Sequence, residues 1–287
     1  MNKIFKVVWS KTKECYVVVS EVAKNNGGKK KVLASVLAGL AMVGVAGMST
    51  PVHAAVDLGN SAVNIAPNGT YNGSNTVGKN SVVVGYQNQT DNSDGNFILG
   101  AASKAFGEGS IAIGNKNTAN GANAYAIGAG ANANGDVALA FGNRASASSY
   151  ALAVGSGANA SNENAVAVGR RTQAAGAAAV GMGLDANAAG DNSVAIGKNN
   201  TTTGGAGGVA IGNTNTSTGD RAISIGESNN SQKEDTITMG YSNTASVGGA
   251  IAIGQNNEAN SGGSAGNTMI AIGRDNKAKA QDPIAIG

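Results

Sequence analysis

The sequence is short of reactive side chains: it has one cysteine, one histidine, one tryptophan and three prolines among 287 residues, and only 13% of its residues are charged. The three single residues are Trp9, Cys15 and His53, so all of them lie within the first 54 positions. Without that segment, the chain has no Cys or His that could act as a nucleophile or general base. A disulfide framework and a zinc site of the usual ligands are excluded for the same reason.

Charge is also distributed unevenly along the chain. The first 54 residues hold eight lysines against two glutamates, a net charge of +6, and the remainder holds twelve basic against fifteen acidic residues, a net charge of −3. The sequence pI of about 8.9 therefore reflects the N-terminal segment alone. A mildly acidic remainder does not favour nucleic acid as a partner.

The N-terminal segment has the pattern of a secretory signal peptide. Three lysines at 29–31 precede an apolar run over 32–48, and small residues follow up to Ala54. We expect residues 1–54 to be an export signal that is cleaved after Ala54, followed by a lead-in segment over 55–79. The alternative is an uncleaved membrane anchor, because 17 apolar residues approach the lower limit for spanning a bilayer.

From about residue 80 to residue 287, one unit is repeated. A four-residue pattern, apolar–small–apolar–Gly, recurs fifteen times at intervals of about 14 residues. A fixed period of this kind is typical of a solenoid in which each repeat adds one layer. The predicted corner glycines are Gly85, Gly100, Gly114, Gly128, Gly142, Gly155, Gly169, Gly181, Gly197, Gly212, Gly226, Gly240, Gly254, Gly273 and Gly287.

The repeat predicts strands and not helices. In the unit that contains Ile111 and Ile113, these two side chains share one face of an extended strand and Ala112 points the other way. Gly114 then permits a corner with positive φ, and a second short strand follows. The fold class is therefore all-β, a single-chain β-solenoid with about 14 residues per coil. The large apolar residues predicted to form the repeat core are Val82, Val84, Ile111, Ile113, Val166, Val168, Val194, Ile196, Val209, Ile211, Ile223, Ile225, Ile251, Ile253, Ile270 and Ile272.

One such coil buries too little apolar surface to be stable by itself. Two large apolar side chains contribute roughly 3–6 kcal/mol on burial, whereas ordering 14 residues costs on the order of 14–28 kcal/mol. The alanine between the two large residues offers a flat face to a neighbouring chain. We therefore expect an obligate homo-oligomer.

Two regions of the sequence resemble one family, the YadA-like trimeric autotransporter adhesins. The unit NSVAIGKNNTTTGG that starts at Asn192 is similar to their head repeats, over roughly 80–287. The N-terminal region resembles the extended signal of type V secreted proteins at Met1–Phe5, Val8–Trp9 and Val19–Lys24. The resemblance implies a left-handed parallel β-roll, three chains intertwined as a homotrimer, and display at the bacterial cell surface or outer membrane.

The resemblance also implies a function without catalysis. The repeats would form an adhesin head that attaches to host extracellular-matrix proteins or cell-surface receptors and to other heads in autoagglutination, with no cofactor and no metal. Members of the family normally continue through a stalk and a membrane anchor, and we expect neither within these 287 residues.

Other interpretations have weaker support. A β-solenoid enzyme of the left-handed acyltransferase type would use a hexapeptide period and typically a catalytic histidine. Three segments fit the dinucleotide pattern G-x-G-x-x-A, at 128–133, 155–160 and 181–186, but a second strand is expected after each where that site needs a helix. Arg170, Arg171 and Lys198 could form a basic patch for an acidic ligand or simply solubilise the surface. The 19-residue interval between Gly254 and Gly273 could form a binding loop or a neutral corner extension.

Overall fold

The computed structural model describes residues 78–260, 268–279 and 283–287, together with the backbone pairing of four short segments nearer the N-terminus. The chain divides into two units, Met1–Thr50 and Pro51–Gly287. In the first unit, β1 (Phe5–Ser10) pairs antiparallel with β2 (Cys15–Ser20). The apolar run over 32–48 lies outside the described residues.

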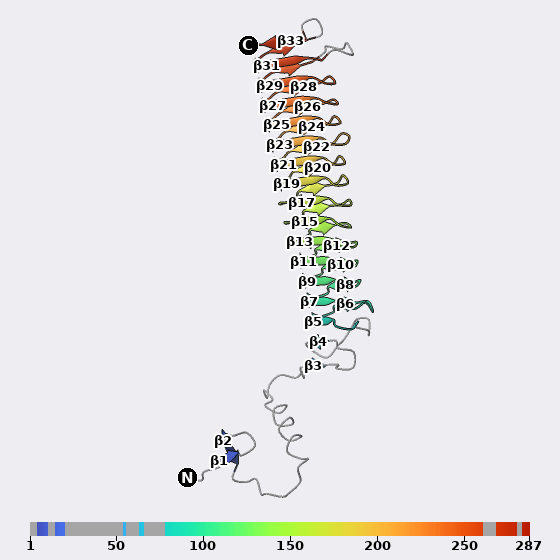
Figure 1. The fold of residues 1–287 in the computed structure, drawn as a ribbon, viewed down its shortest axis with the longest axis vertical. Helices are drawn as coiled ribbons and strands as arrows, with labels where there is room; N and C mark the ends of the chain where they lie inside the picture. Colours follow the sequence, from blue (N-terminus) through green and yellow to red (C-terminus); the bar gives the residue numbers. More distant parts are fainter. Residues whose placement is uncertain are drawn as a thin grey trace. The chain divides into compact units, whose positions relative to one another are not determined.

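The second unit is a stack of similar turns. Each turn has a first strand, a corner that we call the first corner, a second strand, and a second corner that leads to the next turn. Each strand pairs in parallel with the equivalent strand one turn away, as Ile111 does with Tyr125 and Thr118 with Asn132. Figure 1 shows the odd-numbered and even-numbered strands as two stacked rows.

The two rows are two continuous parallel sheets. The first sheet consists of β5 (Val82–Tyr86), β7 (Phe97–Ala101), β9 (Ile111–Asn115), β11 (Tyr125–Ala129), β13 (Leu139–Phe141), β15 (Leu152–Val154), β17 (Val166–Val168), β19 (Val180–Leu184), β21 (Val194–Lys198), β23 (Val209–Asn213), β25 (Ile223–Glu227), β27 (Ile237–Tyr241), β29 (Ile251–Gln255), β31 (Ile270–Arg274) and β33 (Ile284–Ile286). The second sheet consists of β6 (Gln89–Thr90), β8 (Lys104–Phe106), β10 (Thr118–Asn120), β12 (Asn132–Asn134), β14 (Ser146–Ala147), β16 (Asn159–Ala160), β18 (Gln173–Ala174), β20 (Asn187–Ala188), β22 (Thr201–Thr202), β24 (Thr216–Ser217), β26 (Asn230–Ser231), β28 (Thr244–Ala245), β30 (Glu258–Ala259) and β32 (Lys277–Ala278). The expected all-β parallel solenoid is confirmed, with fourteen turns and a fifteenth first strand.

The stacking of first strands begins before residue 80. Strand β4 (Val63–Ile65) pairs in parallel with β5, with Val63 opposite Val82. Strand β3 (Ala54–Ala55) pairs antiparallel with β4. Part of the predicted lead-in segment therefore adds a rung to the first sheet.

The interior of the roll is lined mainly by small residues, with Ile98 and Met269 as completely buried exceptions, and this reverses the orientation expected for the repeat core. Ala112 is completely buried, whereas Ile111 and Ile113 on either side of it are only partly buried. The same alternation recurs in the other first strands from β5 to β31. All sixteen residues predicted to form the repeat core thus point outward, away from the space between the two sheets.

The narrowness of the turn explains this reversal. At Gly181 in β19, an added Cβ would lie 2.6 Å from the carbonyl oxygen of Gln173 and 2.9 Å from the Thr172 methyl group. Thr172 takes the place that a smaller alanine has in several other turns. Opposite it, the first strand has no room even for the methyl group of an alanine at position 181. Because protein interiors are close-packed, the space at this turn excludes isoleucine, whereas the interior position of β7 holds Ile98, which is completely buried.

The pairing of β19 corrects one predicted corner. Gly181 lies between Ala167 and Ala195 in the middle of the sheet, and the corner is formed by Gly183, which pairs with Gly197. With Gly183 in place, the spacing from Gly169 to Gly197 becomes two equal steps of 14 residues. Thirteen of the other predicted corner glycines have positive φ at the first corner, and Gly287 lies directly after β33.

Each turn also holds non-glycine residues in the left-handed region, and one of them is poorly suited to it. Val137 has φ of 55° at the second corner, where the equivalent residues of other turns include Asn123, Asn164 and Asn192. A left-handed conformation costs roughly 1–2 kcal/mol for an ordinary L-residue, and asparagine is among the residues that tolerate it.

Replacing Val137 by asparagine should therefore stabilise the roll. We expect V137N to raise the free energy of unfolding by about 1 kcal/mol, measured as a higher midpoint of thermal unfolding by circular dichroism. V137A is the control, because it removes the β-branch and keeps an unfavourable Cβ. Equal midpoints for V137N and the original chain would show that the corner is not strained.

Candidate functional site

The outer surface of the first sheet is apolar along its whole described length. Each first strand contributes two outward side chains, which makes an apolar face two residues wide and fifteen strands long. Several of its members are well exposed, including Leu99 at 45%, Met182 at 40% and Met239 at 39%. A soluble monomer rarely exposes a continuous apolar patch of this extent, so the face has the properties of an interface.

The outer surface of the second sheet is polar. The first residue of each second strand points outward, and most of these residues carry an amide or a hydroxyl group. They are Gln89, Lys104, Thr118, Asn132, Ser146, Asn159, Gln173, Asn187, Thr201, Thr216, Asn230, Thr244, Glu258 and Lys277. The two sheets of the roll therefore present opposite chemistries to their surroundings.

Buried asparagines three residues after the corner glycines hold successive turns together. The Asn117 side-chain Nδ2 donates to the carbonyl of Ile113 at 2.6 Å and to that of Gly128, in the next turn, at 2.9 Å. Its Oδ1 accepts from the backbone N–H of Ala131 at 2.8 Å. One amide thus satisfies three backbone groups that the corner would otherwise leave without partners.

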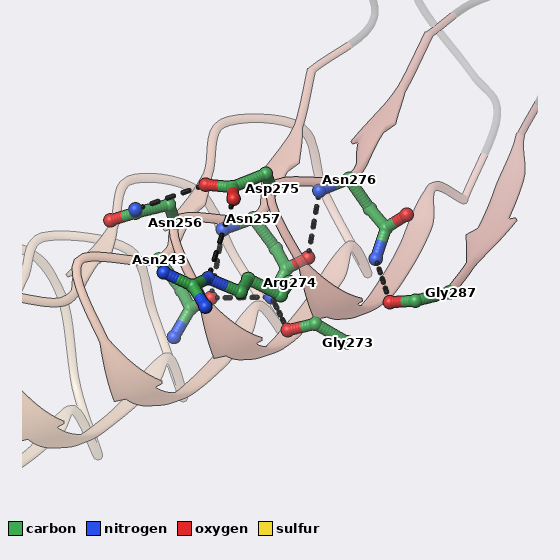
Figure 2. Close-up of polar contacts among 8 residues, drawn as sticks. All are labelled: Asn243, Asn256, Asn257, Gly273, Arg274, Asp275, Asn276 and Gly287. Carbon is green, nitrogen blue, oxygen red and sulfur yellow. Dashed lines mark hydrogen bonds and ion pairs between the residues drawn. The ribbon is translucent and has the colours of Figure 1, made fainter.

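Toward the C-terminus these asparagines form an unbroken ladder of six, Asn200, Asn215, Asn229, Asn243, Asn257 and Asn276. From Asn200 to Asn257, each side-chain amide also bonds the next: Asn257 Nδ2 donates to Asn243 Oδ1 at 2.9 Å and to the carbonyl of Gly273 at 2.7 Å. Figure 2 shows the last rungs, where the Asn276 N–H donates to Asn257 Oδ1 and Asn276 Nδ2 to the Gly287 carbonyl.

The ladder is interrupted in the middle of the roll. The equivalent positions hold Ala131, Ala145, Ala158, Thr172 and Ala186, of which Thr172 donates to the Gly183 carbonyl at 2.5 Å. Sequence reasoning missed the ladder, although asparagine at a fixed distance from the corner glycine was a visible signal. The stretch from Asn200 onward therefore has more bonds between turns than the stretch before it.

The ladder predicts a large difference between two substitutions of Asn229. We expect N229A to cost about 1–3 kcal/mol of unfolding free energy, because it leaves buried backbone groups unpaired. N229D should cost more, since a carboxylate cannot donate to the Ile225 and Gly240 carbonyls, 3.0 and 2.7 Å from Nδ2. The excess should shrink at low pH, where the new carboxyl is protonated and donates.

Denaturant unfolding followed by circular dichroism measures both variants. The neighbouring substitution N230A is the control, because Asn230 belongs to the outward polar row, and it should change stability little. If N229A and N230A were equally mild, the ladder would not be a source of stability.

Two bidentate ion pairs also link successive turns. Arg171 Nε and Nη2 donate to the two carboxylate oxygens of Asp185, both at 2.6 Å, and Arg221 binds Asp235 in the same way. The hydrogen bonds from Arg171 hold the pKa of Asp185 below its usual value. The expected basic patch is therefore partly neutralised, since Arg171 is paired and Asp185 also feels the charges of Arg170 and Lys198.

The acidic turn near the start of the roll is held by its own hydrogen bonds. Partial burial raises the pKa of Asp91, but donation from the Ser93 hydroxyl and from the Gly107 and Ser93 N–H groups outweighs it, so the pKa lies below the usual value. The stability that this lowered pKa contributes is present above the unfolded-state pKa and is lost as the pH falls through the lower, folded-state value. Asp91 thus stabilises the turn between the first two repeats.

The described surface offers no enclosed site for chemistry. A shallow hollow near the last turns is lined by Ser242, Thr244, Asn256, Asn257, Glu258, Asp275 and Lys277; Figure 2 shows Asn256 donating to Asp275 beside it. Within the described residues, no three Asp, Glu, His or Cys side chains are placed to hold a metal ion. The described residues include no helix that is long and apolar enough to cross a membrane.

Three further expectations concern particular segments of the chain. The segments at 128–133, 155–160 and 181–186 each run into a second strand, β12, β16 or β20, and not into a helix. The larger part of the insertion between Gly254 and Gly273, residues 261–267, lies outside the described residues. Ala54 belongs to β3, and cleavage after it stays a prediction.

Comparison with known proteins agrees with this geometry. Residues 1–49 match the Extended Signal Peptide of the type V secretion system. Six segments match the YadA head domain repeat, at 99–117, 119–145, 148–172, 174–200, 204–227 and 232–257. No curated protein matches the chain.

The head-repeat matches cover more than half of the chain, and they coincide with the stacked turns between β7 and β30. The extended signal precedes them, as it does in proteins that reach the cell surface by type V secretion. The chain therefore belongs to the trimeric autotransporter adhesins with YadA head repeats, which are non-enzymatic proteins of the bacterial cell surface.

Proposed function

We propose that residues 80–287, preceded by the lead-in segment over 55–79, form the head of a homotrimer, and that this head attaches the cell to host extracellular-matrix proteins or cell-surface receptors and to other heads in autoagglutination. The roll is left-handed in this proposal, as the resemblance to the family implies. Assembly uses the apolar face, and ligand binding uses the polar face.

The observation that carries the proposal is the orientation of the alternation in the first strands. Alanine occupies most of the inward positions, and two large apolar side chains face outward in each of fifteen consecutive first strands. Only another apolar surface can cover such a face at low cost, because burial of apolar area is favourable in proportion to the area removed from water. Three identical faces meeting at one axis cover one another completely.

The polar face is left on the outside of such a trimer. Asn132 and Gln173 are among its exposed members, and their amide groups both donate and accept hydrogen bonds. A flat surface with amides and hydroxyls repeated at every turn suits an extended protein ligand lying along the sheet. No single residue dominates that surface, which agrees with a ligand bound over many turns.

The assembly is tested by the mass of the exported chain. Sedimentation of residues 55–287 should give three times the mass of one chain, with a circular dichroism spectrum rich in β-structure. A folded monomer would contradict the proposal directly.

The binding face is tested separately by substitutions that keep the trimer. N132R/Q173R should weaken binding to immobilised collagen, fibronectin or laminin, or weaken self-association, while leaving the sedimenting mass unchanged. S156R, at an equally exposed position on the first corner, serves as the control. Undiminished binding of N132R/Q173R to a ligand that the original chain binds would exclude the polar face from contact.

A further inference from the structure

The two long edges of the apolar face carry opposite charge. Every first strand runs from a second corner to a first corner, and all first strands from β5 to β33 are parallel and in register. Residues at the second corners therefore line one edge of the face, and residues at the first corners line the other. Between residues 92 and 200, the second corners hold the acids Asp94, Glu108, Asp136, Glu163 and Asp191, which we call the acidic edge.

The basic residues of the same stretch all lie at the other edge. Lys104, Lys116, Arg144, Arg170, Arg171 and Lys198 follow the first-corner glycines directly or begin the next strand, and we call them the basic edge. Each is exposed, as are the five acids. Asp185 is the single acid on the basic edge in this stretch, and it is paired with Arg171.

The two edges are charged in the same turns. Each acid of the acidic edge is followed, seven to ten residues later, by a base at the other end of the same first strand: Asp94 by Lys104, Glu108 by Lys116, Asp136 by Arg144, Glu163 by Arg170, and Asp191 by Lys198. The turns of Gly128, Gly155 and Gly212 have no charge at either end, and the turn of Gly183 has only Asp185, the partner of Arg171. Scattered solubilising charge would not be matched turn by turn.

Contacts within one chain do not account for this matching. The first strand lies between the two members of each pair, and a strand of five residues is about 16 Å long. No ion pair in the described part of the chain joins the two edges; those present link successive turns or neighbouring residues. Asp94, Asp136 and Asp191 do accept backbone N–H bonds from the turn below, each at 2.8 Å. The Glu108 and Glu163 side chains accept none in the described contacts, and of the bases only Arg171 has a side-chain partner, Asp185.

Rotation about an axis parallel to the roll brings the two edges together. When the apolar faces of several copies surround such an axis, the acidic edge of each copy meets the basic edge of the next at the same height. Two copies packed face to face in opposite directions would instead place like edges against each other. The charge pattern thus favours a parallel ring and opposes an antiparallel dimer.

We propose that the acidic edge of each copy pairs with the basic edge of the neighbouring copy, which forms an ionic seam along residues 94–198 that fixes the direction and height at which the copies join. This inference rests on the proposed ring assembly and adds the residues that select it. The seam ends near Lys198: beyond it, the bases Arg221 and Lys233 lie at second corners beside the acids Asp220, Glu234 and Asp235, and Glu227 lies at a first corner. The two edges there no longer each carry a single sign.

Charge reversal tests the seam. E108K/E163K places bases on the acidic edge in the turns of Gly114 and Gly169, so both edges are basic there. K116E/R170E places acids on the basic edge in the same two turns. The quadruple variant exchanges the charges of these four positions between the edges and so restores opposite signs. At 50 mM salt, we expect each double variant of residues 55–287 to need about tenfold or more protein to reach half assembly. The quadruple variant should assemble like the original chain, although it keeps R170E beside Asp185.

Salt, matched controls and mixing complete the test. The defect of the double variants should shrink in 1 M salt, where charges are screened within about 3 Å. E227K/E234K and K233E/K279E change the net charge equally outside the seam and should assemble normally. A mixture of the two double variants should form mixed rings more readily than either variant alone, because only unlike neighbours then have matched edges.

The outcomes separate the seam from the ring. If the original chain sediments as a trimer and the double variants assemble like their controls, the seam is wrong and the trimer stands. If the original chain sediments as a monomer, the ring itself is wrong. If the quadruple variant is as defective as the double variants, the reversed residues act within one chain, and the seam is also overturned.

Discussion

I211D/I225D is expected to abolish the trimer. Ile211 and Ile225 are outward residues of adjacent first strands, β23 and β25, which pair in parallel. In a trimer these two substitutions bring six carboxylates to the shared axis, where each isoleucine otherwise contributes about 1.5–3 kcal/mol by burial. An unpaired buried charge costs several kcal/mol more, so the effect should exceed that of any other surface change.

Sedimentation and circular dichroism together measure the result. The expected outcome is a monomer or an aggregate with reduced β-structure, because a single roll leaves its apolar face exposed. T216D/N230D is the matched control: Thr216 and Asn230 lie in neighbouring second strands and pair in register, on the polar face. A stable trimer of I211D/I225D would show that the apolar face is not the interface.

G197A is expected to separate two turns of the roll. Gly197 has φ of 116° at a first corner, and an added Cβ would lie 2.0 Å from the carbonyl oxygen of Gly212 in the next turn. Real Cβ atoms do not approach backbone oxygen so closely, so the two turns must move apart and lose the hydrogen bonds between them. We expect a loss of more than about 4 kcal/mol of unfolding free energy, the range of the most severe single substitutions.

A second glycine with positive φ provides the control. Gly130 has φ of 70°, and the nearest atom to an added Cβ is the Arg144 Cγ at 3.8 Å. Asparagine occupies the equivalent position in the turn of Asn199, so G130N should be tolerated. Denaturant unfolding compares the two variants, and equal stability would mean that contact between stacked corners does not limit the choice of residue.

The periodic features of the fold could be predicted from the sequence, but the orientation of the repeat could not. Alternation assigns Ile111 and Ala112 to opposite faces of a strand, and it does not say which face is interior. The width of the turn decides that question, and width depends on how two strands and two corners close on each other. Burial of large apolar residues is a sound general rule, but here most inward positions of the first strands hold alanine, and Ile98 of β7 is an exception.

Register raised a similar difficulty at one turn. Both Gly181 and Gly183 end a four-residue stretch of the repeat type, and the local pattern does not choose between them. Stacking on Gly169 and Gly197 makes the choice, because every first corner sits on the one below. Of the candidate site, the repeat residues and most corners were predictable, whereas the asparagine ladder and the charged edges became clear only once the turns were aligned.

Because the turns stack in register, whole turns can be added to the head or removed from it without a change in the remaining turns. The turns that end in Asn215, Asn229, Asn243 and Asn257 present the same backbone groups above and below. Removing the 14 residues that follow Asn215 would join surfaces that already fit, and would shorten the head by about 4.8 Å, the spacing of neighbouring strands. Gain or loss of whole turns can therefore change the length of the polar face, while the cross-section of the head stays constant.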